Sequence, residues 1–219
     1  MQVQTPLFKE IDQSELSSLL MALRARVVSV PKDHMIYQEG QFVHELGILI
    51  KGSIVTTRTD YSGHKNILGN LCQGQIFAAT YALLHAHVMV NLIANEDCEI
   101  VFLNLNMLSD IENQSASWYP KLITNLMRIL GQENLELSKQ GYHTISKHIR
   151  GRVWSYLTTE AREHASNEFD IPFNRQQMAD YLNLDRSALS NELGKMRDEH
   201  LIEFRKNHFK ILDGPITPD

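Results

Sequence analysis

The chain has 219 residues, 43% of them hydrophobic, and a formal net charge of −5. This length allows one large domain or two modest ones. No run approaches the roughly 20 apolar residues of a membrane helix, and the N-terminus lacks the basic and then apolar segments of a secretory signal. We therefore expect a soluble cytoplasmic protein without a membrane partner. The two cysteines, Cys72 and Cys98, form no CxxC motif, which favours free thiols.

The first part of the chain predicts one helix followed by a β-rich region. Residues 6–24 have helical apolar spacing, with Ser14 as a candidate N-cap. Short β-prone runs follow, separated by turn-forming residues such as those at 60–63. The runs are 27–30, 35–37, 46–50, 53–58, 65–70, 92–94 and 99–103. Such close spacing favours an antiparallel, cupin-like β-roll over βαβ units.

A long helix is predicted from about residue 117 to 138 or beyond. Its apolar residues Leu122, Leu126 and Ile129 recur at heptad spacing. This seam could be buried against its own domain or could pair with a second copy of the chain. A long helix between two small domains favours pairing, and we expect a homodimer.

The stretch from Asn174 to Leu201 predicts two helices joined by a tight turn. The first helix covers residues 175–182 with Asn174 as its N-cap, and Asn183 suits the left-handed conformation of the helix exit. Asp185 then caps a second helix from residue 186 to about 200. The plain alternative is an αα-hairpin with a solvated outer face.

The outer face of that second helix is rich in hydrogen-bonding groups, as expected for a helix that reads base edges in the DNA major groove. Residues 202–212 then predict two β-strands around a basic turn, with Arg205, Lys206 and Lys210 suited to phosphate contact. This order is that of a winged helix-turn-helix. The predicted DNA-binding residues are Arg175, Gln176, Arg186, Ser187, Ser190, Asn191, Lys195, Arg205 and Lys206.

Three stretches together resemble the Crp/Fnr family of bacterial transcription regulators. They are the roll motifs at 36–40, 49–54 and 73–77 with their turn glycines, the segment 149–153, and the helix-turn-helix 174–202. The resemblance implies an α+β chain with an effector-sensing β-roll at 1–115, a dimerisation helix at 116–145 and a winged helix-turn-helix at 146–219. It also implies a homodimer on pseudo-palindromic double-stranded DNA, and contact with RNA polymerase.

The resemblance assigns roles to individual positions of the second helix. Arg186 stands where members of the cyclic-AMP type have a guanine-reading arginine, although a phosphate contact is the alternative. Ser187 replaces a base-reading glutamate, and Asn191 replaces an arginine and could read adenine. The resemblance therefore implies a half-site other than the best-known one of the family.

The effector site departs from the family pattern. Alignment puts Ala78 and Ala79 at the glycine and glutamate of the cyclic-nucleotide site, and Val88-Met89 at its phosphate-binding Arg-Ser pair. Without the cation, a buried cyclic phosphate would lose its counter-charge, so we expect a different small effector. A pocket filled by its own side chains stays open as an alternative. The predicted lining is Phe77, Tyr81, Leu84, His85, Met89, Asn91, Leu137 and Ser138.

No cofactor, metal ion or catalytic motif is predicted. Cys72, His85 and His87 are conceivable haem ligands, but isolated ligands of this kind are a weak signal. His85 and His87 would share one face of a strand, without a third ligand at metal-site spacing. The motifs of hydrolases, P-loop proteins, zinc proteases and dinucleotide-binding enzymes are missing. An enzyme is therefore not expected.

Overall fold

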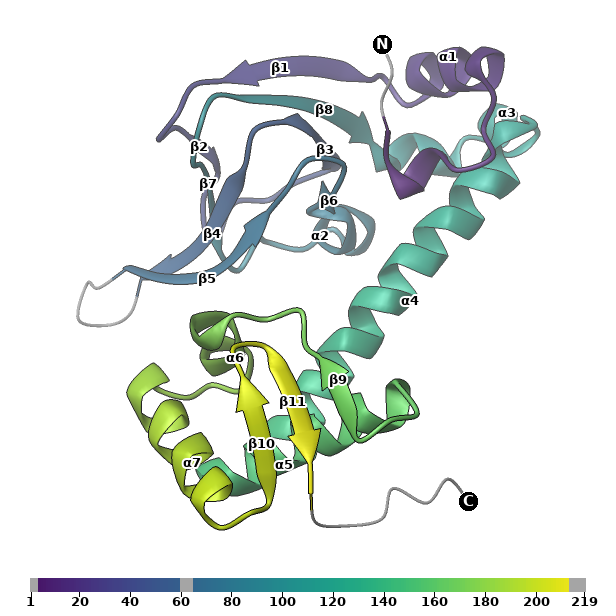
Figure 1. Ribbon diagram of the computed structural model, residues 1–219. Helices are drawn as coiled ribbons and strands as arrows, with labels where there is room; N and C mark the ends of the chain where they lie inside the picture. The colour runs from purple at the N-terminus through teal and green to yellow at the C-terminus, as the bar shows by residue number, and fades with distance from the viewer. Residues whose placement is uncertain (1–3, 60–64, 213–219) are drawn as a thin grey trace. The chain divides into compact units, whose positions relative to one another are not determined.

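The computed structural model describes residues 4–59 and 65–212 (Figure 1). The chain forms two compact units, residues 1–132 and 133–219. The boundary falls inside the helix α4 (Trp118–Thr144), which contributes residues to both units. The sequence-based division at residues 115 and 145 stays a prediction.

The first unit begins with helices and continues as a β-roll. Its elements are η1 (Pro6–Phe8), α1 (Gln13–Ala22), β1 (Arg26–Val30), β2 (Met35–Tyr37), β3 (Glu45–Lys51), β4 (Ile54–Thr59), β5 (Lys65–Leu71), β6 (Ile76–Phe77), α2 (Ala79–Leu84), β7 (Asn91–Ala94), β8 (Cys98–Asn104), η2 (Leu105–Ser109) and α3 (Ile111–Gln114). All seven predicted β runs are strands. The predicted turn at 60–63 lies outside the described residues.

The α1 helix is capped by Asp12, so the expectation of a Ser14 cap was wrong. The Asp12 carboxylate accepts hydrogen bonds from the backbone N–H groups of Ser14 and Glu15, and Glu15 binds back to the Asp12 N–H. This reciprocal capping box satisfies donors that a helix start leaves free. Ser14 lies one residue inside the helix, where its hydroxyl donates to Asp12.

Two four-stranded antiparallel sheets form the roll, in the orders β1-β8-β3-β6 and β2-β7-β4-β5. This arrangement confirms the predicted antiparallel roll. Because side chains alternate along a strand, β8 serves two cores. Ile100 and Phe102 face the interior between the sheets, whereas Val101 and Leu103 pack toward α1 and the start of α4.

Three tight turns of the roll depend on glycine. Gly40, Gly52 and Gly74 have φ values of 84°, 92° and 87°, a region that side chains with a Cβ rarely adopt. At Gly52 an added Cβ would also lie 2.7 Å from the Asp97 carbonyl oxygen. The glycines that carried the family resemblance are thus required by the backbone.

The strand on which His85 and His87 were expected to share a face is not formed. Residues 79–84 form the short helix α2, and His85 ends it with a left-handed φ of 50°. His87 pairs with Phe42 in an isolated bridge. His85 and His87 therefore do not share a strand face. The helix α2 was not predicted, because six residues are too short a run to show helical periodicity.

The second unit is a helical core closed by a three-stranded sheet. Its elements are the last part of α4, then α5 (Ile149–Glu163), β9 (Glu168–Asp170), α6 (Arg175–Tyr181), α7 (Arg186–Asp198), β10 (Ile202–Arg205) and β11 (His208–Ile211). The sheet order is β10-β11-β9. The strand β9 was not predicted, because three residues are too few to show alternation.

No helix in the described ranges is both long enough and apolar enough to cross a membrane.

Candidate DNA-binding surface

The α7 helix has one fully buried face. Leu189, Leu193 and Met196 have no exposed surface and pack in a core with residues of α5, α6 and the sheet. Their spacing of four and three residues places them on one side of a helix. The opposite face of the helix therefore points outward, whereas Glu192, at the edge of that face, reaches Arg150 of α5.

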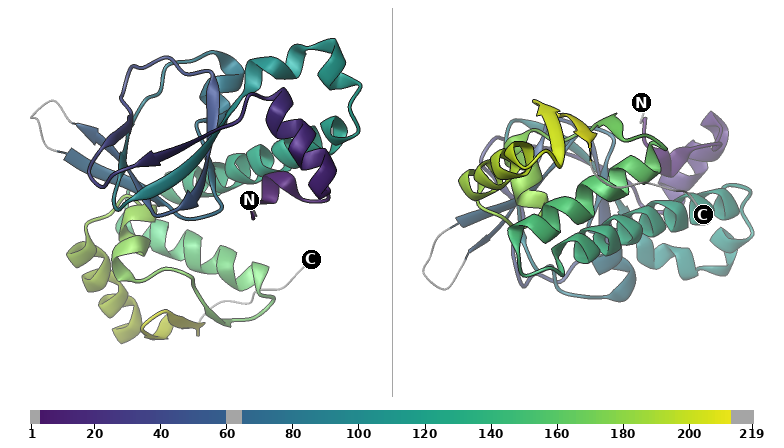
Figure 2. Two further views of the ribbon diagram at one scale, coloured as in Figure 1. Left: turned by 90° about the horizontal axis from the view of Figure 1, so that it is seen from above. Right: turned by 60° about the horizontal axis from the view of Figure 1, so that its bottom comes forward.

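That outward face carries the predicted base-reading residues. Arg186, Ser187, Ser190, Asn191 and Lys195 are all exposed. Within the second unit, Figure 2 shows α7 beside the yellow β10–β11 hairpin. The exposed face therefore presents hydrogen-bond donors and acceptors of the kind that can pair with base edges in a major groove. The buried face holds the helix in place.

The start of α7 is fixed by Asp185, which confirms the predicted cap. Its carboxylate accepts from the N–H groups of Ser187 at 2.8 Å and of Ala188 at 3.0 Å. These hydrogen bonds, with that from the Ser187 hydroxyl as the largest cause, hold the pKa of Asp185 below its usual range. Because the Ser187 hydroxyl donates to Asp185, its oxygen is left to accept a hydrogen bond from another group.

The turn between the two helices has the predicted geometry. Asn174 caps α6 in a capping box with Gln177, and Asn183 adopts a left-handed φ of 51°. Arg152 on α5 donates to the carbonyl oxygens of Leu182 and Asn183 at 3.1 and 2.9 Å. These two hydrogen bonds attach the turn to α5. Arg152 was not among the predicted site residues.

A second arginine of α5 anchors α7. Arg150 donates to Glu192 at 2.6 Å and binds Glu199 through two parallel hydrogen bonds of 2.7 and 2.8 Å. These carboxylates raise the pKa of Arg150 further. Bidentate pairs fix orientation as well as contribute energy. The family-like segment 149–153 could have indicated this role, because it places two arginines near the helix-turn-helix.

Gly151, between these arginines, leaves room for the turn that starts α5. A Cβ there would meet the Ser146 hydroxyl oxygen at 2.2 Å. The Arg152 Nε also donates to the Ser146 carbonyl oxygen at 2.7 Å. The close approach explains a glycine inside a helix, where it otherwise costs about 1 kcal/mol.

Arg175 holds the wing from inside the unit. Its guanidinium donates to the Lys206 carbonyl oxygen at 2.9 Å and lies over the rings of Phe204 and Phe209, 5.0 and 5.2 Å from their centroids. Burial lowers its pKa. The nearby Gln176 is exposed but donates to Asp180 at 2.8 Å. Arg175 therefore has an intramolecular role, and its DNA contact stays a prediction.

The wing is a hairpin of β10 and β11 with exposed basic side chains. Arg205 and Lys206 are exposed at its tip, and Lys210 is exposed on β11. Lys206 has a left-handed φ of 56°. His208 contacts Asp170 at 3.1 Å and Glu168 at 3.2 Å, and these two carboxylates raise its pKa. The contacts of His208 thus connect β11 to β9, and the basic side chains at the tip are exposed to solvent.

The residues predicted to line an effector pocket lie in different environments. Phe77 is buried, with its ring edge-to-face against Tyr37 and Phe102 and directly over Gly47, where a Cβ would lie 2.0 Å from the ring. Tyr81 is half-buried against the same core. The ring of Phe77 therefore fills the roll interior.

The other predicted pocket residues lie toward the surface. Leu84 and Met89 are 71% and 60% exposed, and His85 is exposed as well. The Asn91 side chain accepts from the Glu39 N–H at 2.9 Å. Leu137 and Ser138 lie on the part of α4 in the second unit, and both are exposed. These residues do not share one environment, and their joint role stays a prediction.

Comparison with known proteins agrees with this architecture. The family model of the cyclic nucleotide-binding domain matches residues 27–115, and that of the Crp-like helix-turn-helix domain matches residues 151–215. The electron transport regulator A of Shewanella oneidensis is 23% identical over 191 residues, which cover 84% of this chain and 74% of that protein. The transcriptional regulatory protein btr of Bordetella pertussis is 24% identical over 170 residues, which cover 75% and 68%.

Among solved structures, the crystal structure of the Thermus thermophilus catabolite activator protein has the same fold. Its TM-score is 0.54 at 21% sequence identity, and the match covers 94% of this chain and 93% of that one. The two domain models match in the order that the structure shows, and together they cover more than half of the chain. These relatives are regulators and not enzymes. The chain belongs to the Crp/Fnr family of transcription regulators.

Proposed function

We propose that the chain binds a pseudo-palindromic site on double-stranded DNA as a homodimer, with α7 in the major groove. The observation that carries this proposal is the division of α7 into a fully buried apolar face and an exposed polar one. Arg186 lies at the first position of the helix. The N-terminal residues of a recognition helix contact base edges, so Arg186 is the proposed guanine reader.

The wing supplies phosphate contacts beside the groove. Arg205 and Lys206 are consecutive in the sequence and exposed at the tip of the hairpin. Such contacts raise affinity without reading sequence and weaken as salt rises. With a net charge of −5, the protein depends on local basic residues and on base contacts for binding.

The dimer is proposed to form along α4, but through a different seam from the expected one. Leu122 and Leu126 are 1% and 4% exposed because they pack in the core of the first unit. The predicted seam through Leu122, Leu126 and Ile129 is thus largely used within the chain, and that expectation was wrong.

A second seam, shifted by one residue or about 100° around the helix, is more exposed, although its members Ile123 and Leu130 are half-buried against the core of the first unit. It repeats at alternating intervals of four and three residues, the spacing of a coiled coil. Its members are Ile123, Met127, Leu130, Asn134, Leu137 and Gly141. Met127 and Leu137 are each 67% exposed. Asn134 falls at an a position, where a buried polar residue specifies register in paired helices.

The proposed dimer sets the spacing of the DNA half-sites. Two copies of α7 related by a twofold axis would read major grooves one helical turn apart, ~34 Å along the duplex. The operator would accordingly be pseudo-palindromic. Contact with RNA polymerase, and action in the cytoplasm where genomic DNA is found, belong to the same proposal.

The effector is proposed to be a small molecule other than a cyclic nucleotide. Val88, aligned with the phosphate-binding arginine, is 1% exposed and packs in the roll interior. A buried phosphate near this position would have no cationic partner from that residue, which costs several kcal/mol. Leu84 and Met89 offer exposed apolar surface nearby in the sequence, which favours an apolar or aromatic effector.

The α4 helix is the proposed route from effector to DNA. It is continuous over Trp118–Thr144, and it contributes Trp118 to the first core and His143 to the second unit. An effector that changes how two copies of α4 pair would change the spacing of the two α7 helices. This mechanism requires an open and a closed pairing with different effector affinities.

A gel-shift experiment with fragments of genomic DNA tests the proposed function. We expect a complex on a few fragments that survives at ~150 mM salt. Non-specific complexes should disappear between low salt and this concentration. The absence of any specific complex at the higher salt, with and without candidate effectors, would contradict a regulator that reads DNA sequence.

A separate measurement tests the effector proposal. Thermal unfolding is followed with cyclic AMP, with cyclic GMP and with a set of small aromatic acids. We expect no shift of the melting temperature from either cyclic nucleotide, because binding to the native state would have to raise it. A saturable shift by cyclic AMP would overturn this part without affecting the DNA-binding part.

A further inference from the structure

The side chain of Arg175 connects the first helix of the helix-turn-helix to the wing. Arg175 is the first residue of α6, and its Nη2 donates to the Lys206 carbonyl oxygen, 31 positions later in the sequence, at 2.9 Å. The other terminal nitrogen, Nη1, lies 3.8 Å from the sulfur of Met178. Both terminal nitrogens of the guanidinium thus have partners within the chain.

Two aromatic rings of the wing hold the plane of this guanidinium. Its Cζ lies 5.0 Å from the ring centroid of Phe204 on β10 and 5.2 Å from that of Phe209 on β11. The two rings are stacked with their centroids 5.7 Å apart, and Phe209 is fully buried. The face of an aromatic ring attracts a cation, and more strongly where water is excluded. Arg175 is therefore held by both strands of the wing.

The carbonyl group that Arg175 binds belongs to the turn at the tip of the wing. Lys206 and Asn207 form this turn, and Lys206 has a left-handed φ of 56°, which is unfavourable for a residue with a Cβ. On the other side of the tip, the Ile171 N–H donates to the Asn207 carbonyl oxygen at 2.9 Å. The Asn207 side chain donates back to the Ile171 carbonyl oxygen at 3.1 Å. The backbone of the turn is thus fixed by α6 and by the segment before it.

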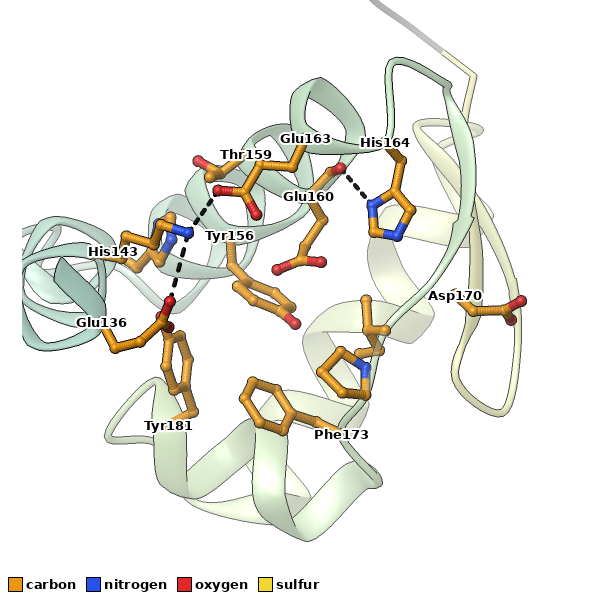
Figure 3. Close-up of a pocket in the computed structure, with 13 residues that line it drawn as sticks. Glu136, His143, Tyr156, Thr159, Glu160, Glu163, His164, Asp170, Phe173 and Tyr181 are labelled. Carbon is orange, nitrogen blue, oxygen red and sulfur yellow. Dashed lines mark hydrogen bonds and ion pairs between the residues drawn. The ribbon is translucent and has the colours of Figure 1, made fainter. Parts of the chain in front are cut away.

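The start of α6 is itself fixed to α5. The ring of Phe173, two residues before Arg175, lies 5.0 Å from that of Tyr181 and 6.0 Å from that of Tyr156 on α5. Figure 3 shows these three rings gathered together. Asn174 caps the helix between them and Arg175. Arg175 therefore extends from a fixed backbone position, and its side chain transmits that position to the wing.

We propose that Arg175 is a positioning residue for the wing. It places the cationic side chains of Arg205 and Lys206 for phosphate contact, and it acts through them rather than through a phosphate contact of its own. A planar guanidinium can lie over rings and donate in a fixed direction at the same time, which an ammonium cannot. This inference rests on the proposed DNA-binding function.

The salt dependence of DNA binding separates the two roles of Arg175. In the full-length protein, fluorescence anisotropy measures how the affinity for the genomic duplex selected by gel shift changes with salt, on logarithmic scales. Each phosphate contact contributes about 0.9 to the magnitude of the slope. A wing variant with both Arg205→Ala and Lys206→Ala should lower this magnitude by about 1.8. Arg175→Met should lower it by the same amount, although both wing cations are still present.

A double-mutant cycle gives the decisive comparison. Arg175→Met introduced into the wing variant should change the slope no further, because the phosphate contacts that Arg175 positions are already lost. A direct phosphate contact of Arg175 would instead lower the magnitude by about 0.9 in both backgrounds. Arg162→Met, which removes the same charge from an exposed position on α5, should leave the slope unchanged.

Two further variants change the contacts of Arg175 but not the charge of the protein. Arg175→Lys keeps the cation and loses the planar group, and Phe204→Leu removes one of the two rings that the guanidinium contacts. Both should lower the slope toward that of the wing variant. A direct phosphate contact would survive both changes, because counterion release depends on charge.

A measurement without DNA tests the inference independently of the proposed function. Hydrogen–deuterium exchange of the full-length Arg175→Met and Phe204→Leu proteins should be faster than that of the wild type at residues 203–210 and unchanged along α7. A wild type that binds no DNA would contradict the proposed function, whereas this exchange experiment would still decide whether Arg175 holds the wing.

Three results would overturn the proposal. They are a slope loss in Arg175→Met that adds to that of the wing variant, a slope that Arg175→Lys and Phe204→Leu leave unchanged, and wild-type exchange at residues 203–210 in the two exchange variants. Arg175→Lys and Phe204→Leu keep the test available if Arg175→Met fails to fold.

Discussion

The helices α7 and α2 present their outer faces in different ways. The 13 residues of α7 start at a carboxylate cap and rest on a fully buried apolar face, so that polar side chains are exposed. The six residues of α2 have no side-chain cap, begin and end at left-handed residues, and expose Leu84. Left-handed conformations are costly for residues with a Cβ.

This contrast indicates what each surface needs. The conformation of α7 is fixed within one chain, because the helix has an N-cap and a fully buried apolar face. The α2 surface carries backbone strain at Ala78 and His85 together with exposed apolar area. Strained, apolar surface of this kind suits a segment that a ligand or a partner covers.

The largest effect expected is on the pairing of α4. Leu137→Glu places two like charges in the proposed seam of the dimer, which costs several kcal/mol. Light scattering should then find a monomer at micromolar concentration, whereas we expect a dimer for the wild type. Leu135→Glu is the control, because Leu135 is 55% exposed but lies outside the seam. A dimer that survives Leu137→Glu, or that Leu135→Glu disrupts equally, would show that this seam is not the interface.

The second largest effect is expected when a side chain on the buried face of α7 is truncated. Leu193→Ala leaves a cavity in the core of the second unit and should lower the free energy of unfolding by roughly 2–5 kcal/mol. Ser190→Ala, on the exposed face of the same helix, should change it by less than about 0.5 kcal/mol. Urea unfolding followed by circular dichroism measures both. Similar losses in the two variants would mean that the outer face is also structural.

A smaller effect tests the strain in α2. Ala78→Gly should leave the stability unchanged or raise it by up to about 1 kcal/mol, because glycine adopts a φ of 60° without strain. Ala188→Gly, in α7, should instead lower it by roughly 0.5–1 kcal/mol. Thermal unfolding compares the pair. If Ala78→Gly destabilises as much as Ala188→Gly, the proposed strain at the start of α2 is wrong.

The smallest effect concerns the pH dependence of the wing. Because Asp170 and Glu168 raise the pKa of His208, the protonated histidine is favoured in the folded state. Its contribution to stability is fully present below the unfolded pKa of about 6.5 and is lost as pH rises through the higher folded value. An NMR titration of His208 should show a raised midpoint, which Asp170→Asn lowers. A midpoint that Asp170→Asn leaves in place would argue against this ion pair.

The helix-turn-helix was predictable because its signals are local. Asn174 and Asp185 have the side chains that cap helices, and Asn183 is a residue type that tolerates the left-handed turn. All three occupy the predicted roles. The polar outer face of α7 was also predicted, and the strands of the roll followed from the turn residues between them.

The parts that sequence reasoning missed depend on long-range contacts. Arg150 reaches Glu199, 49 positions away, and no local pattern pairs them. The heptad spacing at Leu122 and Leu126 is real, but only tertiary packing decides which of two adjacent seams the first unit buries.

The central claim is that the outer face of α7 reads base sequence, and Arg186→Ala tests it most directly. Competition gel shifts at ~150 mM salt compare a selected operator with the same operator changed at one guanine per half-site. The wild type should discriminate against the changed base by ~1–3 kcal/mol per contact, and Arg186→Ala should lose this discrimination while light scattering still finds a dimer. Equal discrimination by the wild type and Arg186→Ala at every position of the operator would contradict the assignment.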